Sequence, residues 1–157
     1  MMKKICKISG ILFLILAMLC ACGQKGEVAL NVEEMAEALQ SGIAFKDQMN
    51  EVELPIFYAL YNLSEEEVKN AVMVGSTGAT AEEIAVVEAT SADAAKKVKD
   101  AVSERVAFQR SGFENYVPQE LEKLEDPVIV TKGNYVILCV SDDDQKAQEI
   151  IDKYVTE

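Results

Sequence analysis

Histidine is absent from this chain of 157 residues, and basic residues are scarce, since 15 Lys and Arg face 27 Asp and Glu. Without histidine, the chain lacks the commonest general base and the commonest transition-metal ligand. Catalytic triads built on histidine are therefore excluded. A surface this acidic repels phosphate backbones, because nucleic-acid binding draws its affinity from Lys and Arg. We expect no nucleic-acid partner, no cofactor and no bound metal.

The apolar segment near the N-terminus is too short for a membrane span. Ile11–Leu19 carries no charge, but a transmembrane helix needs about 20 apolar residues, and polar residues follow from Gly23. A basic stretch that contains Lys3, Lys4 and Lys7 precedes the segment. This order is typical of an export signal. We expect residues 1–21 to be removed as a signal peptide.

The end of this segment, Leu19-Cys20-Ala21-Cys22-Gly23, resembles a lipobox. A leucine stands three residues before Cys22, and the small Ala21 directly precedes it, as a protease that cuts before a lipid-bearing cysteine requires. Two or three acyl chains anchor a protein stably, whereas one anchors it marginally. We expect a lipoprotein that is held by Cys22 on the extracytoplasmic face of the cell membrane. The alternative is a secretory cut after Ala21 that leaves Cys22 as a free thiol.

Removing the three lysines of the leader leaves 12 basic residues against 27 acidic ones, a net charge of −15. Only Cys139 then keeps a thiol, because Cys6 and Cys20 leave with the leader and the sulfur of Cys22 becomes a thioether when it takes the lipid. It lies in an apolar strand, so we expect an inert core group. The predicted organisation is a tether at residues 22–30 and one domain at residues 31–157.

Periodicity in the domain predicts helices and strands. Asn31 caps a helix that Gly42 ends, Ser91 begins the longest helix with Gly112 as its stop, and Pro118 opens a short one. Ser64 and Glu67 form a capping box that predicts a helix to about Asn70. The stretch Phe45–Tyr61 is left open, because Pro55 suits either a helix start or a turn.

Four strands are expected, the last two joined by the turn at Lys132-Gly133-Asn134, and a final helix follows from about Gln145. The strands span residues 71–74, 84–89, 128–131 and 135–140. The predicted fold class is α+β, a single domain with a small antiparallel sheet covered by helices.

Two segments carry a family resemblance: GATAEEIAVV (Gly78–Val87) and GNYVILCVSDD (Gly133–Asp143). Together with the lipobox they resemble a family of lipoproteins from anaerobic Gram-positive bacteria, the domain of unknown function 4358. The likeness covers roughly Phe45–Ile151. It implies location and architecture, and it supplies no activity or binding residues.

Three candidate sites have simpler structural explanations. The loop Gly75–Gly78 lacks the lysine and following helix of a phosphate-binding loop, so we interpret it as a hairpin loop, although Ser76, Thr77 and Thr80 would offer hydroxyls to a ligand. Asp142–Asp144 is interpreted as acidic residues at a helix start rather than a calcium site. Glu82 and Glu83 point to opposite faces of a strand, which makes them poor partners for acid–base chemistry.

These observations predict a binding or interaction module at the cell envelope without a catalytic residue. Its partner would be an envelope protein or a glycan. One alternative is an enzyme that uses two carboxylates, such as a glycan hydrolase. Another is a small solute-binding lipoprotein, although such receptors usually need two lobes.

Overall fold

The computed structural model describes residues 29–155; the predicted leader, Cys22 and most of the tether lie outside the described residues. The elements share one sheet and the helices around it, in the order α1 (Val32–Gly42), β1 (Asn50–Val52), α2 (Leu54–Tyr61), β2 (Val68–Gly75), β3 (Glu83–Ala89), α3 (Ala92–Phe113), η1 (Pro118–Glu120), α4 (Leu121–Glu125), β4 (Val128–Lys132), β5 (Tyr135–Val140) and α5 (Asp144–Val155). The predicted α+β class is confirmed.

The sheet has five strands in the order β1-β2-β3-β5-β4, and all neighbours are antiparallel. Strand β5 lies between β3 and β4 and is buried along its whole length, which confirms the prediction of an apolar strand. The expectation of about four strands missed β1, which pairs Val52 with Met73 at the sheet edge. This strand is only three residues long and lies in the stretch that the sequence pattern left open.

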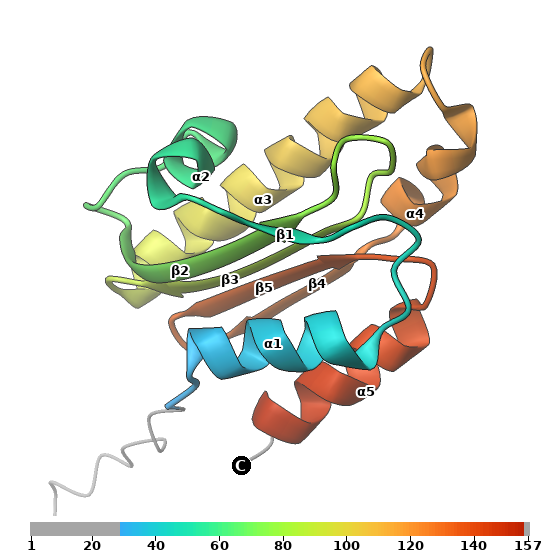
Figure 1. The fold of residues 1–157 in the computed structure, drawn as a ribbon. Helices are drawn as coiled ribbons and strands as arrows, with labels where there is room; N and C mark the ends of the chain where they lie inside the picture. The colour runs from blue at the N-terminus through green and yellow to red at the C-terminus, as the bar shows by residue number, and fades with distance from the viewer. Residues whose placement is uncertain (1–28, 156–157) are drawn as a thin grey trace, which may run out of the picture.

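Helices cover both faces of the sheet, so the domain has three layers (Figure 1). Alternate residues of β3 face opposite layers, because side chains alternate along a strand. Ala85 and Val87 pack toward α2, α3 and α4, whereas Ile84 and Val86 pack toward α1 and α5. Leu30 is buried in the α1–α5 layer, so the folded domain begins inside the segment predicted as tether.

The predicted helix from Ser64 to Asn70 is wrong. The capping interaction itself exists, since Glu67 Oε2 accepts hydrogen bonds from Ser64 Oγ at 2.6 Å and Ser64 N at 3.2 Å, but it closes a turn. Strand β2 then begins at Val68, which is buried and pairs with Ala89 of β3. Pairing across the sheet therefore overrides the local helix signal.

Three helix ends test the capping predictions. Helix α1 ends at Gly42 as predicted, but α3 continues through Gly112 to Phe113. Gly112 is not among the glycines with positive φ, which are Gly78 and Gly133 in the described part of the chain, so it does not adopt the left-handed conformation that ends helices. Asp143 caps α5 as predicted, because its Oδ1 accepts a hydrogen bond from Lys146 N at 2.9 Å.

None of the helices that the structure describes is long and apolar enough to cross a membrane.

Substitution by alanine should have opposite effects on stability at the helical Gly112 and at Gly133, which has a positive φ. Gly112→Ala should raise the free energy of unfolding by about 0.4–1 kcal/mol, because alanine suits a helical backbone and a Cβ there has nothing within 4 Å. Gly133→Ala should lower it by more than that, because φ is +57° in the β4–β5 turn. Urea unfolding measures both, and destabilisation by Gly112→Ala would contradict the helical assignment.

Candidate functional site

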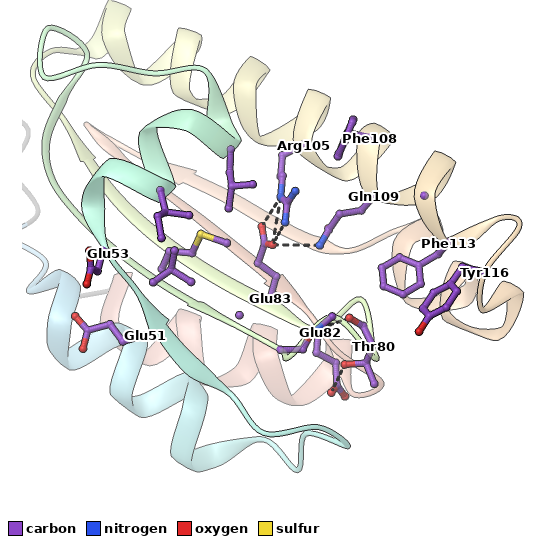
Figure 2. A pocket seen from close by; sticks show the side chains of 18 residues that line it. Glu51, Glu53, Thr80, Glu82, Glu83, Arg105, Phe108, Gln109, Phe113 and Tyr116 are labelled. Carbon is purple, nitrogen blue, oxygen red and sulfur yellow. Dashed lines mark hydrogen bonds and ion pairs between the residues drawn. The ribbon is translucent and has the colours of Figure 1, made fainter.

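A groove of about 700 Å³ opens between α2 and the C-terminal half of α3. Strand β1 and the loop that follows β2 also line the groove, with Glu51 and Glu53 on the side of α2 and Thr80 on the side of Tyr116 (Figure 2). On α3, Arg105, Gln109 and Gly112 follow one another at helical spacing and therefore share the face turned to the groove. The volume lies in the range of small-ligand sites, which is about 300–1,000 Å³.

Exposed apolar side chains gather at this groove. Six large apolar residues are prominently exposed in residues 29–155, and four of them line the groove: Ile56 at 51%, Leu60 at 37%, Phe108 at 73% and Tyr116 at 70%. Scattered exposed apolar residues are normal on a protein, but a contiguous group marks an interaction site. The walls of the groove are therefore suited to an apolar ligand surface.

The floor of the groove is polar and is organised by Glu83 of β3. This side chain is buried, and its carboxylate accepts hydrogen bonds from Tyr61 Oη at 2.5 Å, Arg105 Nη2 at 2.6 Å and Gln109 Nε2 at 3.1 Å. Arg105 Nε also approaches Glu83 Oε1 at 3.2 Å, so the ion pair is bidentate. Such geometry is needed to offset the desolvation of two buried charges. Residues from α2 and α3 thus meet at this carboxylate of β3, and Figure 2 shows the two from α3, Arg105 and Gln109.

The environment of Glu83 shifts the pKa of its partners. Burial, followed by the charge and hydrogen bond of Glu83, raises the pKa of Tyr61 well above its usual value. Burial disfavours the charged form of Arg105, but the hydrogen bonds and charge of Glu83 outweigh this effect and raise the pKa of the guanidinium. Tyr61 therefore stays protonated and Arg105 stays charged at neutral pH.

A second polar cluster surrounds the buried Lys123 of α4. Its Nζ lies 2.7 Å from Glu120 Oε2, 3.5 Å from Glu82 Oε1 and 3.6 Å from Asp142 Oδ2. Glu82 also accepts hydrogen bonds from the backbone of the α1–β1 connection, with Lys46 N at 2.9 Å. The cluster thus joins α4, two loops and the end of β5. Glu82 and Glu83 do point to different partners, as predicted.

The loop after β2 is a hairpin loop, as predicted, and all three of its candidate hydroxyls are engaged within the protein. Ser76 Oγ donates to the Thr80 carbonyl at 2.6 Å, and Thr80 Oγ1 donates to Glu82 at 2.9 Å. Thr77 Oγ1 donates to Asp47 Oδ2 at 2.6 Å, and this bond helps to hold the pKa of Asp47 below its usual value. The loop is therefore tied to its surroundings by its own side chains.

The three acidic residues before α5 have different roles. Asp143 caps the helix, but Asp142 lies 2.7 Å from Lys46 and belongs to the Lys123 cluster, which corrects the expectation that all three serve the helix start. Burial raises the pKa of Asp144, and the negative charges of Asp126, Asp143 and Asp142 raise it further. Across residues 29–155, no three His, Cys, Asp or Glu side chains are placed to hold a metal ion.

A model of one protein family, the domain of unknown function DUF4358, matches residues 42–141. The chain belongs to this family. The match runs from the end of α1 to the end of β5 and includes every residue that lines the groove. No curated protein and no solved structure matches the chain. Membership of this family therefore identifies related proteins but assigns no activity to the chain.

Sequence reasoning missed the groove because its polar floor is assembled from distant segments. Tyr61 and Arg105 lie 22 residues from Glu83 on either side, and Gln109 lies 26 residues away. One signal was present in the sequence. Gln109 continues the inward stripe of α3 that contains Val102 and Val106, so a polar residue occupies a core position there.

The substitution Tyr61→Phe tests whether the hydrogen bond from Tyr61 to Glu83 stabilises the floor of the groove, because the stability that it contributes should depend on pH. At pH 7 the loss of a hydrogen bond to a charged carboxylate should cost about 1.5–3 kcal/mol of unfolding free energy. Because the pKa of Tyr61 is higher in the folded state than in the unfolded state, the stability contributed by its proton is present below about pH 10 and lost as the pH rises further. Urea unfolding should therefore show a smaller difference between variant and parent above pH 10. If variant and parent differed in unfolding free energy by the same amount at pH 7 and above pH 10, the hydrogen bond of Tyr61 to Glu83 would not have this stabilising role.

Cys139 should react slowly with thiol reagents in the folded protein. It is fully buried, and burial raises the pKa of its thiol to about 12, against a smaller lowering by Ser141. Labelling mapped by mass spectrometry should be fast at Cys139 only in denaturant, whereas the control Tyr116→Cys should react at once in the native state. Rapid native labelling of Cys139 would show that strand β5 is accessible.

Proposed function

We propose that this chain is a membrane-anchored binding module of the cell envelope, and that the groove between α2 and α3 is its binding surface. The observation that carries the proposal is the gathering of four exposed apolar side chains around a polar floor. Leaving such a patch exposed to water is unfavourable, and a bound partner would remove it from solvent.

The N-terminal sequence supports the anchor. A basic stretch, an apolar segment and Leu19-Cys20-Ala21-Cys22 follow in the order of a lipoprotein precursor. Lipid on Cys22 would hold the chain at the outer face of the cell membrane. Helix α1 begins at Val32, in the layer opposite the groove, so an anchor ahead of α1 leaves the α2–α3 layer available to a partner (Figure 1).

The state of the buried acids supports binding rather than hydrolysis. Glu83 is saturated by Tyr61, Arg105 and Gln109, and Glu82 accepts hydrogen bonds from two backbone N–H groups and Thr80. A general acid or nucleophile needs a carboxylate that reaches the substrate. We therefore favour an envelope protein or glycan as partner, and the acidic net charge disfavours nucleic acid.

Site-specific photocrosslinking in intact cells tests the proposal. A photoreactive residue at position 116, beside the groove, should capture a partner, whereas one at position 154 on α5 should not. The capture should be lost in Gly112→Leu, because a Cβ at Gly112 has nothing within 4 Å and the longer side chain would occupy space in the groove that Gly112 lines. Cys22→Ala should release the chain from the membrane fraction. Equal products from both positions, or none from position 116, would contradict the proposal.

A further inference from the structure

One buried polar atom at the groove is left without a partner. Gln109 is 9% exposed, and its Nε2 donates to Glu83, but its Oε1 has no hydrogen-bond partner among the described residues. The carboxylate fixes the orientation of the amide, because turning it over would face one oxygen with another. A buried acceptor without a donor is rare and unfavourable in folded proteins. Gln109 lines the groove, but Oε1 itself is buried from solvent, so a ligand there supplies the missing donor only when the Gln109 side chain turns toward it.

A hydrogen-bond donor lies one helical turn away. Arg105 uses Nε and Nη2 to bind Glu83, which leaves Nη1 without a hydrogen bond within residues 29–155. A guanidinium carries five N–H donors and no acceptor. Arg105 lines the groove beside Gln109 (Figure 2). Within the described residues, the floor therefore holds an unpartnered acceptor and an unpartnered donor one turn apart on α3.

This pair is complementary to the backbone of an extended peptide. In an antiparallel ladder, one residue donates its N–H and accepts at its C=O on the same side of the chain. Side chains of an extended peptide alternate between its two faces. A peptide whose backbone faces the floor would place alternate side chains against Ile56 and Leu60 on α2 and against Phe108 and Phe113 on α3.

We propose that the groove binds an extended apolar peptide segment, with the N–H of one residue bonded to Gln109 Oε1 and the C=O of that residue bonded to Arg105. This inference rests on the proposed binding function and names its ligand class. Glu51 and Glu53 are exposed at the rim of the groove on the side of α2. Glu51 pairs with Val74 and so faces the other layer of the sheet, but both carboxylates add negative charge at this end of the groove and favour a segment with a basic residue there.

Isothermal titration of the full chain in lipid nanodiscs tests this ligand class. The probes are terminally blocked tetrapeptides with Leu, Ile, Val or Phe at the two central positions and Lys at both ends. We expect saturable binding that disappears in Gly112→Leu, whose melting temperature should match or exceed that of the parent. Peptides with Glu at both ends should bind more weakly. Lipid partitioning is the same for parent and variant, so their difference isolates the groove.

Ester analogues of the tightest peptide separate backbone recognition from apolar contact. Replacing one backbone N–H by an ester oxygen should weaken binding roughly tenfold at a single position, because Gln109 Oε1 again lacks a donor. The proposal is overturned if no peptide binds saturably, if Gly112→Leu binds equally well, or if every ester matches its amide parent. Groove-dependent photocrosslinking without peptide binding would leave the proposed function standing and reject only the peptide. Failure of both measurements would reject both.

Discussion

The buried carboxylate of Glu83 is the interaction on which the groove depends. It lies on the central strand β3 and binds Tyr61 from α2 together with Arg105 and Gln109 from α3. A buried ion pair stabilises a fold only when its hydrogen-bonding capacity is filled, because both charges lose their hydration. Here the hydrogen-bond donors to Glu83 come from α2 and α3, the two helices that form the walls of the groove. The same contacts therefore set the position of α2 relative to α3.

Two neighbouring acids organise two different regions because strand side chains alternate. Glu83 serves the α2–α3 layer, whereas Glu82 approaches Lys123 and binds the backbone at Lys46 and Asp47. The Glu83 cluster includes a buried amide oxygen, Gln109 Oε1, that has no hydrogen-bond partner in the described part of the chain. Within residues 29–155, the cluster around Glu82 and Lys123 contains no buried side-chain oxygen or nitrogen without a partner. This difference explains why we place ligand binding at the first cluster and a structural role at the second.

The fold was largely predictable where local patterns and tertiary pairing agree. The turn at Gly133, the apolar strand ending at Val140 and the cap at Asn31 all appear as predicted. Prediction failed where the two disagree, since Val68 begins a strand despite the helix signal at Ser64 and Glu67. The site was less predictable, because Glu83 finds its partners through side-chain contacts that depend on how the helices pack on the sheet. A polar Gln109 on a buried stripe was the signal available.

Amide hydrogen exchange in Glu83→Gln tests most directly whether this carboxylate holds the groove together. The control is Glu88→Gln on the same strand, whose ion pair with Lys69 at 2.7 Å involves a well-exposed lysine. Our account predicts that Glu83→Gln speeds exchange in α2 and in the C-terminal half of α3, while α1 and α5 keep their protection and the control changes little. Unchanged protection in α2, or an equal loss of protection in every helix, would contradict it.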